Sequence, residues 1–429
     1  MFKPSGLEVL KFPCNLQVVY QPLPTAAVVA DVWIQAGSSL EEEQTSGLAH
    51  LLEHMIFKGT PKLAPGMFDR FIENQGGFTN AATSHDYVHY FVVTAVSQFL
   101  PALSALGHLL LQASIPDAEL EEERRVVLAE IHQGEDNPDY WGWEHFNQQL
   151  YPCHPYGRSI LGAKDRVLRH SVADLQEFHR SYYQPHNMTI VVAGGIDRET
   201  CLGGIETAFA EFPALPSENA ENASANQRRL SRLSTETIAS PQGFQPNRRE
   251  LSLPYLEQAR LMLGWQAPPV TQFRDACGLQ LLSIALAGGR SSRLVQELRE
   301  QRGVVQEVWA ELDLRKSAGR FTITSWLMEA DLPLTEALIL HQLQRLRQEP
   351  LAEWELKRSQ QLLLNDLVFS TETPLQVTAL YGYYSILQDP SLALRYPQQI
   401  QGLTAADLQE ISQQYLTDQT YVATIVRPA

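Results

Sequence analysis

Residues 47–60 read GLAHLLEHMIFKGT, a stretch in which apolar residues recur at helical spacing. These apolar residues are Leu48, Leu51, Leu52, Met55 and Ile56. Because positions three and four apart share one side of an α-helix, the spacing predicts an amphipathic helix with one face in a core. Thr45 and Ser46 come just before it, and a hydroxyl at either position is a suitable N-cap.

The same stretch holds His50, Glu53 and His54 in the order H-x-x-E-H. Residues four apart on a helix have Cβ atoms about 5–6 Å apart, so the two imidazoles are able to bind one Zn²⁺. Glu53 lies beside both and is placed to accept a proton from a water molecule that the metal has made acidic. This order is the inverted zincin signature. The alternative interpretation is a pair of solvated or core histidines, and a third ligand distinguishes the two.

The third ligand of a zinc hydrolase is expected in residues 117–135, DAELEEERRVVLAEIHQGE, which read as a helix. Most of its carboxylates are typical of a solvated face. Glu123 and Glu130 are seven residues apart and therefore lie on one side of the helix. Glu130 stands among apolar residues, where a carboxylate is costly unless it is paired or bound to metal. We therefore predict Glu130 as the third ligand and Glu123 as a supporting carboxylate behind the ligands.

Composition and charge exclude several other classes of protein. The 429 residues are 44% hydrophobic and 19% charged, as in globular domains, and the net charge of −16 disfavours nucleic acid and anionic lipid as partners. No stretch is apolar over the roughly 18 residues that a membrane span requires. The four cysteines lie far apart, so neither a disulfide framework nor a thiolate zinc site is expected. The start, MFKPSGLEVLKF, resembles neither a signal nor a transit peptide, and we expect a cytoplasmic protein.

The sequence also predicts two domains. Residues 215–250 are rich in Ser, Asn, Ala, Pro and Arg, as in an exposed linker between a domain over residues 1–214 and another over residues 251–429. The two domains look alike, because a strand-like run, a loop and a helical pattern follow one another from residue 26 and again from residue 259. Strands mixed with long helices predict an α+β fold of two homologous layered α/β-sandwich domains related by duplication.

Four parts of the sequence together resemble the insulinase/pitrilysin (M16) metallopeptidases, over essentially the whole chain. They are residues 47–60, Glu130 within RRVVLAEI, residues 80–91 (NAATSHDYVHYF) and residues 154–162 (HPYGRSILG). The length and layout are similar to the short branch that includes the mitochondrial processing peptidase β subunit and bacterial relatives. The resemblance implies a zinc endopeptidase with one Zn²⁺ per chain, in which each chain is half of a clamp around a chamber that admits unfolded peptides.

The resemblance assigns roles to five residues already named: zinc ligands to His50, His54 and Glu130, general base to Glu53, and supporting carboxylate to Glu123. It also implies that the substrate pairs as an extra strand with a sheet edge near residues 78–83. Backbone pairing of that kind gives affinity with little sequence demand. Gly76 and Gly77 just before this edge permit a close backbone approach, unless they form a plain turn. The implied substrate-binding residues are Phe78, Thr79, Asn80 and Ala81.

The chain departs from the family pattern in residues 288–308, GGRSSRLVQELREQRGVVQEV. Active members carry an Arg here and a Tyr seven residues later, which reach the substrate carbonyl across the clamp and stabilise the oxyanion. Arg299 is present as a substrate-binding residue, whereas Gln306 occupies the Tyr position. We therefore expect a homologous partner chain to supply the Arg and Tyr in a heterodimer, and a homodimer is less favoured. Alternatively, Arg299 is a salt-bridged helix residue beside Glu297 and Glu300.

The predicted function is hydrolysis of short unstructured peptides or presequences by a zinc endopeptidase. One alternative is a noncatalytic scaffold or partner-binding subunit of the same fold. Such members usually have a damaged H-x-x-E-H motif, whereas this motif is complete here. A second alternative is a zinc hydrolase of small molecules. Two imidazoles and a carboxylate suit Zn²⁺, although Co²⁺ and Mn²⁺ also fit such a site in vitro.

Overall fold

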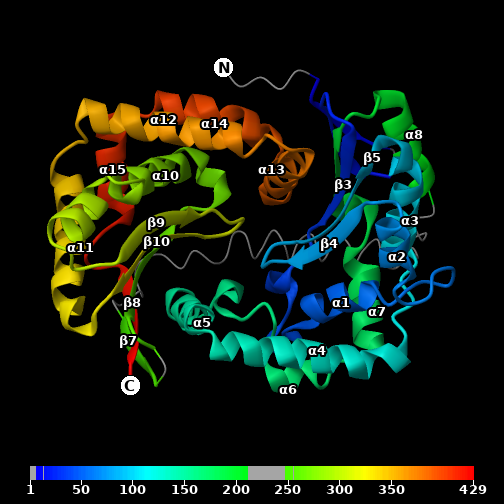
Figure 1. Cartoon of the computed structure of the whole chain (residues 1–429), viewed down its shortest axis with the longest axis horizontal. Coiled ribbons are helices and arrows are strands. Elements are labelled where there is room, and N and C mark those ends of the chain that lie inside the picture. Colours follow the sequence, from blue (N-terminus) through cyan, green and yellow to red (C-terminus); the bar gives the residue numbers. More distant parts are fainter. Residues whose placement is uncertain (1–5, 13, 211–246, 255) are drawn as a thin grey trace. The chain divides into compact units, whose positions relative to one another are not determined.

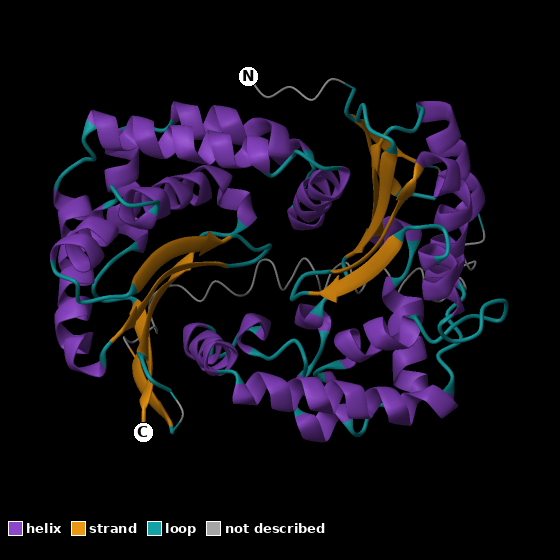
Figure 2. Cartoon of the chain, in the orientation of Figure 1, coloured by secondary structure: helices purple, strands orange, loops and turns teal. Residues whose placement is uncertain are grey.

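The computed structural model describes residues 6–12, 14–210, 247–254 and 256–429. The chain divides into two compact units, and each is assembled from three segments. The first comprises Met1–His132, Arg158–Ser231 and Ser370–Leu394, and the second comprises Gln133–Gly157, Arg232–Phe369 and Arg395–Ala429. Each unit therefore contains one segment from the opposite half of the chain, in contrast to the contiguous domains 1–214 and 251–429 expected from the sequence. In both units helices flank a sheet (Figure 2), which confirms the predicted α+β class.

The first unit is built on a six-stranded sheet in the order β1-β2-β6-β3-β5-β4. Figure 1 labels β3, β4 and β5 of this sheet. Strands β2 and β6 run parallel, and the other neighbours are antiparallel. The strands are β1 Glu8–Lys11, β2 Gln17–Pro22, β3 Ala27–Ile34, β4 Phe78–Thr83, β5 Val88–Ala95 and β6 Met188–Gly194. Since β4 is the last strand on its side, its outer edge has no strand partner among the described residues.

Helices cover the sheet because its side chains alternate between two apolar faces. Every second residue of β3 from Val28 to Ile34 joins one hydrophobic core with side chains of α1, α3 and α7. The residues between them, Val29, Asp31 and Trp33, lie on the opposite face and are also buried. The helices of this unit are α1 Leu48–Ile56, α2 Met67–Glu73, α3 Phe99–Leu111, α4 Asp117–Asp136, α6 Lys164–Val167, α7 Val172–Tyr182, α8 Arg198–Ala208 and α13 Pro374–Leu387. The last four residues of α4 belong to the second unit.

Helix α13 comes from the C-terminal half of the chain and packs on β3 and β6 of the first unit (Figure 1). A glycine makes this approach possible. A Cβ atom on Gly382 would lie 2.1 Å from Nε1 of Trp33, which is closer than real Cβ contacts. The helix therefore lies directly on the indole ring, and any side chain at this position would separate the two.

We expect Gly382→Ala to destabilise the protein by about 1–3 kcal/mol, because the added methyl group overpacks the contact with Trp33. Gly203→Ala on α8 is the matched control, since a Cβ there meets nothing within 4 Å. The control should be neutral or stabilising by up to about 1 kcal/mol, because alanine favours a helix over glycine. Urea unfolding followed by circular dichroism measures both, and equal stability of the two variants would contradict the packing argument.

The second unit repeats the same sheet without the first strand. Its order is β7-β11-β8-β10-β9, with β7 and β11 parallel and the other neighbours antiparallel. This matches β2-β6-β3-β5-β4 strand by strand, as a duplication predicts. The strands are β7 Asn247–Leu253, β8 Ala259–Ala267, β9 Glu307–Asp313, β10 Gly319–Leu327 and β11 Tyr421–Pro428. The helices are α5 Pro138–Leu150, α10 Phe273–Ala287, α11 Leu332–Gln348, α12 Glu353–Phe369, α14 Ser391–Gly402, which begins in the first unit, and α15 Ala405–Tyr415.

Helix α5 packs on the second sheet at the strands that correspond to those covered by α13 in the first. It comes from the N-terminal half of the chain and packs on β8 and β11. Again a glycine meets an aromatic ring, since a Cβ on Gly264 would lie 2.1 Å from Cζ of Phe146. These two helices explain why neither unit is a contiguous stretch of sequence.

Two further sequence expectations concern the linker and the membrane. Residues 215–246 of the predicted linker lie outside the described residues, and residues 247–250 belong to β7 instead. Among the helices that the structure describes, none is both long and apolar enough to cross a bilayer.

Candidate metal centre

Helix α1 presents His50, Glu53 and His54 and is the helix that the sequence predicts. Its other six residues, Leu48, Ala49, Leu51, Leu52, Met55 and Ile56, are all buried. The predicted hydroxyl N-cap is wrong: Gly47, with a φ of 86°, is the N-cap and offers no side chain. The carboxylate of Glu41 accepts hydrogen bonds from the first amides of the helix instead.

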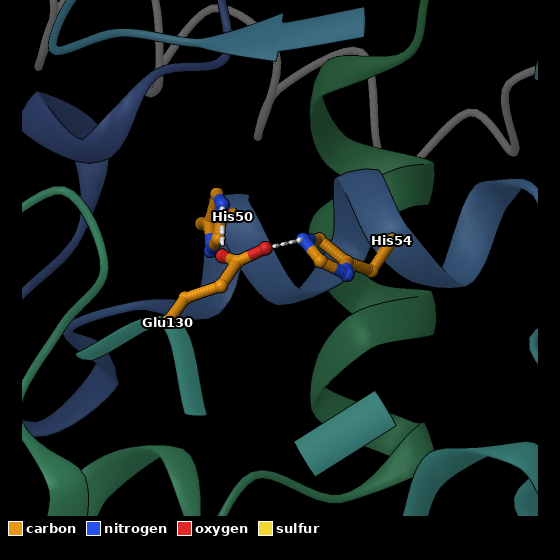
Figure 3. A group of neighbouring side chains, drawn as sticks. All are labelled: His50, His54 and Glu130. Carbon is orange, nitrogen blue, oxygen red and sulfur yellow. Dashed lines mark ion pairs between the residues drawn. The ribbon is translucent and has the colours of Figure 1, made fainter. Parts of the chain in front are cut away.

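The structure brings His50, His54 and Glu130 together (Figure 3). One ligand atom from each lies within 4.8 Å of the other two. Nε2 of His50 is 3.6 Å from one oxygen of Glu130, and Nε2 of His54 is 3.8 Å from the other. These separations exceed hydrogen-bond length but approach the roughly 3.3 Å between two ligands of a tetrahedral zinc ion. Two imidazoles and one carboxylate are also a donor set that zinc accepts, so the three residues fit this ion.

The burial of the two carboxylates on α4 differs from the prediction. The side chain of Glu130 is 40% exposed, whereas that of Glu123 is 7% exposed. The buried side of α4 carries Leu120, Glu123, Val127 and Ile131, while Val126 is exposed. Glu130 therefore does not stand in an apolar environment, and the cost of burial is not what directs it toward the histidines. It lies at the margin of the buried stripe, one helical turn after Val127 and next to Ile131, and from there it reaches His50 and His54.

Glu123 binds the ring nitrogen of His54 that faces away from Glu130. Its Oε2 lies 3.0 Å from Nδ1 of His54, and its Oε1 is paired with the ammonium of Lys58. Burial alone would raise the pKa of Glu123, but the hydrogen bonds and positive charges of His54 and Lys58 outweigh it and lower the pKa. Because Nδ1–H of His54 donates to this carboxylate, the lone pair of Nε2 is directed toward Glu130.

Glu53 and His50 lie in a low-dielectric environment. Burial raises the pKa of Glu53, although a hydrogen bond from Thr83 and the nearby His54 and His89 oppose the shift. The hydroxyl of Thr83, at the end of β4, donates to Oε2 of Glu53 at 2.5 Å. Burial, together with the charge of His54, lowers the pKa of His50 to about 3. A neutral imidazole and a carboxylate of raised basicity are the states needed for a metal ligand and a proton acceptor.

Sequence reasoning missed three residues of this centre. Lys58 lies four residues after His54 but beyond the end of α1 at Ile56, so helical spacing does not predict its contact with Glu123. Thr83 ends a strand that was predicted for another role. Glu41 stands in a run of three glutamates, and nothing in that run distinguishes the buried one from its exposed neighbours. Only the folded chain identifies Glu41 as the partner of α1.

The predicted substrate-binding residues Phe78, Thr79, Asn80 and Ala81 share one strand, β4, at the free edge of the first sheet. The side chain of Phe78 is half exposed and packs edge-on against Phe91 of β5. Gly76 adopts a φ of 74°, so the chain reverses just before the strand. The turn interpretation therefore applies to Gly76, whereas Gly77 approaches the backbone of β5 closely, since a Cβ there would lie 2.6 Å from the carbonyl oxygen of Val93.

Arg299 lies in the second unit, on the π-helix Val295–Gln301. Its guanidinium donates two hydrogen bonds to Oε1 of Glu300, as the salt-bridge interpretation expected. Glu300 also accepts a hydrogen bond from Arg290. The backbone N–H of Gln306 donates to the carbonyl of Trp326.

Comparisons with known proteins identify the family. The model described as "Insulinase (Peptidase family M16)" matches residues 17–164, and that described as "Peptidase M16 inactive domain" matches residues 170–363. The zinc protease PqqE of Helicobacter pylori is 25% identical over 422 residues, covering 96% of this chain and 91% of that protein. YmxG of Bacillus subtilis, described as an uncharacterized zinc protease, is 27% identical over 368 residues and 85% of each chain.

Two solved structures share the fold. The crystal structure of a protease from Helicobacter pylori matches with a TM-score of 0.88 at 24% identity, over 98% of this chain and 99% of that one. The structure described as a peptidase M16 inactive domain from Pseudomonas fluorescens matches with a TM-score of 0.83 at 18% identity, over 99% and 98% of the two chains. From the two family models, which together span most of the sequence, and from relatives named as zinc proteases, we conclude that the chain belongs to peptidase family M16.

Proposed function

We propose that this protein is a zinc-dependent endopeptidase in which His50, His54 and Glu130 hold one Zn²⁺ and Glu53 is the general base. The convergence of these three side chains from α1 and α4 is the observation that carries the proposal. The relatives named as zinc proteases support the choice of metal. Short unstructured peptides or presequences are the substrates.

Each residue of the centre has a distinct part in peptide hydrolysis. A zinc ion held by the three ligands supplies Lewis acidity, which makes a water molecule acidic near neutral pH and polarises the scissile carbonyl. Glu53 accepts the proton of the attacking water and returns it to the leaving amine. Thr83 fixes one oxygen of Glu53 by its hydrogen bond and so orients the other. Glu123 keeps His54 in the tautomer whose Nε2 is free to bind.

The substrate pairs with the free edge of β4 in this proposal. Backbone groups of Phe78, Asn80 and their neighbours offer hydrogen bonds that are independent of the peptide's side chains. Thr83 at the end of the same strand contacts Glu53, so a peptide aligned on β4 extends toward the general base. The net charge of −16 favours basic peptides by electrostatic attraction. Each chain would form half of a chamber that excludes folded proteins.

Gln306 favours a two-chain enzyme. An amide has a different reach from a phenol and lacks its acidity, so oxyanion stabilisation is incomplete in this chain alone. We therefore propose a heterodimer with a homologous chain that carries Arg and Tyr at these positions, and a homodimer remains the second arrangement.

A quenched fluorescent peptide tests the proposed function. The zinc-loaded chain is assayed alone and mixed with its candidate partner, each with and without a chelator. Because loss of one oxyanion donor costs about 10²–10³ in kcat, the mixture should exceed either chain alone by about 10²-fold. A partner in which the Tyr is replaced by Phe is the control. Turnover that a chelator leaves unchanged would contradict the zinc mechanism, and an active chain with no gain on mixing would contradict the heterodimer.

A noncatalytic subunit of the same fold is the second candidate. The family model that matches residues 170–363 describes an inactive domain, and Gln306 lies within it. The same assay separates the two functions. A folded, zinc-loaded chain that stays silent with its partner present would favour the scaffold.

A further inference from the structure

The segment just before α1 holds a buried carboxylate to which the proposed reaction gives no part. Glu41 is 5% exposed and follows the 3-10 turn Ser38–Leu40. Its Oε2 accepts a hydrogen bond from the N–H of Gly47 at 3.0 Å, and its Oε1 accepts one from the N–H of Ala49 at 2.7 Å. Burying an ionisable group costs free energy unless it is hydrogen-bonded, so both oxygens of Glu41 are committed to the start of α1.

Helix α1 needs such a partner because its own N-cap cannot provide one. The first N–H groups of any helix have no acceptor within the helix. At Gly47 there is no side chain to accept them, and the surrounding residues are buried from water. The carboxyl group of Glu41, from outside the helix, replaces a local cap. Burial raises its pKa to about 8, although the hydrogen bonds from Ala49 and Gly47 oppose the shift.

Contacts on the other side of the same turn leave the start of α1 little freedom. The guanidinium of Arg158 donates to the backbone carbonyl of Glu41 at 2.6 Å. Gly162, with a φ of 80°, touches Gly47 backbone to backbone, since a Cβ on Gly162 would lie 2.5 Å from Cα of Gly47. Glu41 and Gly162 therefore enclose Gly47 from two directions.

The start of α1 is also connected to α4, which carries the remaining residues of the centre. Nε2–H of His170 donates to the carbonyl of Ser46 at 2.9 Å. The carbonyl of His170 in turn accepts a hydrogen bond from Arg124 on α4. Arg124 is adjacent to Glu123, the carboxylate behind His54. A displacement at the start of α1 would therefore change the position of the histidines relative to α4.

We propose that Glu41 is a positioning residue for the metal centre: by fixing the first turn of α1 it sets how His50 and His54 face Glu130. The proposal rests on the proposed function, because it gives Glu41 a part in zinc binding. His50 directly follows Ala49, whose amide Glu41 holds, so a loosened first turn acts on the first ligand at once. Zinc requires its ligands in tetrahedral arrangement, and affinity falls when they are displaced.

Glu41→Gln tests the proposal in the full chain. The amide keeps the shape of the side chain but presents an NH₂ group to one of the two N–H donors. Glu43→Gln is the matched control, because Glu43 lies two residues after Glu41 and is exposed, at the start of the 3-10 helix Glu43–Thr45. We measure hydrogen exchange of the α1 amides in the metal-free protein, zinc affinity by competition with a chromophoric chelator, and the absorption spectrum of the Co²⁺-substituted protein.

We expect Glu41→Gln to speed exchange in α1, with α3 and α8 unchanged, and to weaken zinc binding by about 10–100-fold, as loss of a group that orients a ligand does. The Co²⁺ spectrum should change as well, whereas Glu43→Gln should match the wild type throughout. Wild-type zinc affinity and Co²⁺ spectrum in Glu41→Gln would overturn the proposal, even if α1 exchanged faster, because Glu41 would then stabilise the helix alone.

Two further results keep the test decisive. A wild-type chain that binds no zinc would refute the proposed function, and exchange in the metal-free protein would still show whether Glu41 holds the first turn of α1. If Glu41→Gln does not fold, Glu41→Asp replaces it. The aspartate keeps the charge but is one methylene too short to reach both amides, so it should show the same effects at smaller size. Wild-type behaviour in Glu41→Asp would overturn the proposal.

Discussion

Replacing Glu53 with glutamine should lower kcat for peptide hydrolysis by about 10²–10⁴-fold while zinc remains bound. Glutamine preserves the size of the side chain and its ability to accept the hydrogen bond from Thr83. It cannot take up a proton from water, so the loss reports the general-base step alone. Because Glu53 is outside the group of three converging ligand atoms, the metal content should not change.

Steady-state kinetics together with metal analysis checks this expectation. Glu43→Gln, the exposed neighbour of Glu41, is a suitable control for loss of one negative charge from the same part of the chain. Retained turnover in Glu53→Gln would exclude Glu53 as the base. Loss of zinc together with turnover would instead show that Glu53 is needed to form the metal site.

Glu130→Gln should remove zinc and activity together. A neutral amide is a poor replacement for the carboxylate ligand, and only two imidazoles would remain. Zinc affinity should fall by more than the loss of about 10–100-fold that follows removal of a group hydrogen-bonded to a ligand. Glu122→Gln is the matched control, because Glu122 lies on the same helix and is exposed.

Zinc titration of the metal-free variants distinguishes a ligand from a bystander. Glu130 is 40% exposed, so its replacement should change the thermal stability of the metal-free protein little. A folded Glu130→Gln variant with wild-type zinc affinity would contradict the assignment of the third ligand. It would direct the search for that ligand to the other carboxylates around His50 and His54.

The three metal ligands differ in how far the sequence alone predicts them. His50 and His54 are four residues apart on a helix, so their proximity follows from local geometry alone. Glu130 was identified for a wrong reason, since its neighbour Val126 is exposed and the buried carboxylate on α4 is Glu123. Which side of α4 faces the core depends on the packing of α4 against the rest of the unit, and no helical pattern in an acidic segment shows that.

The two compact units also show that local sequence patterns predict helices but not how the helices pack. A periodic pattern indicates that α5 and α13 are helices, but not which sheet each one covers. Gly382 of α13 contacts Trp33 of β3, and Phe146 of α5 contacts Gly264 of β8, so both contacts join residues far apart in the sequence. Such shape complementarity exists only between folded surfaces, which is why the predicted domains were contiguous and the observed units are not.

The amino-acid sequence by itself determined the α+β class, the repeated sheet, the helix with the H-x-x-E-H motif and membership of the M16 family. Each of these depends on local periodicity or on short motifs that are recognised without knowledge of the fold. The tertiary structure decided that Glu41 caps α1, that Lys58 and Glu123 support His54, and that Thr83 contacts Glu53. Except for Glu41, which lies six and eight residues before the two amides that it binds, these interactions join segments far apart along the chain, and their distances are set by the packing of α1, α4 and β4 around one core.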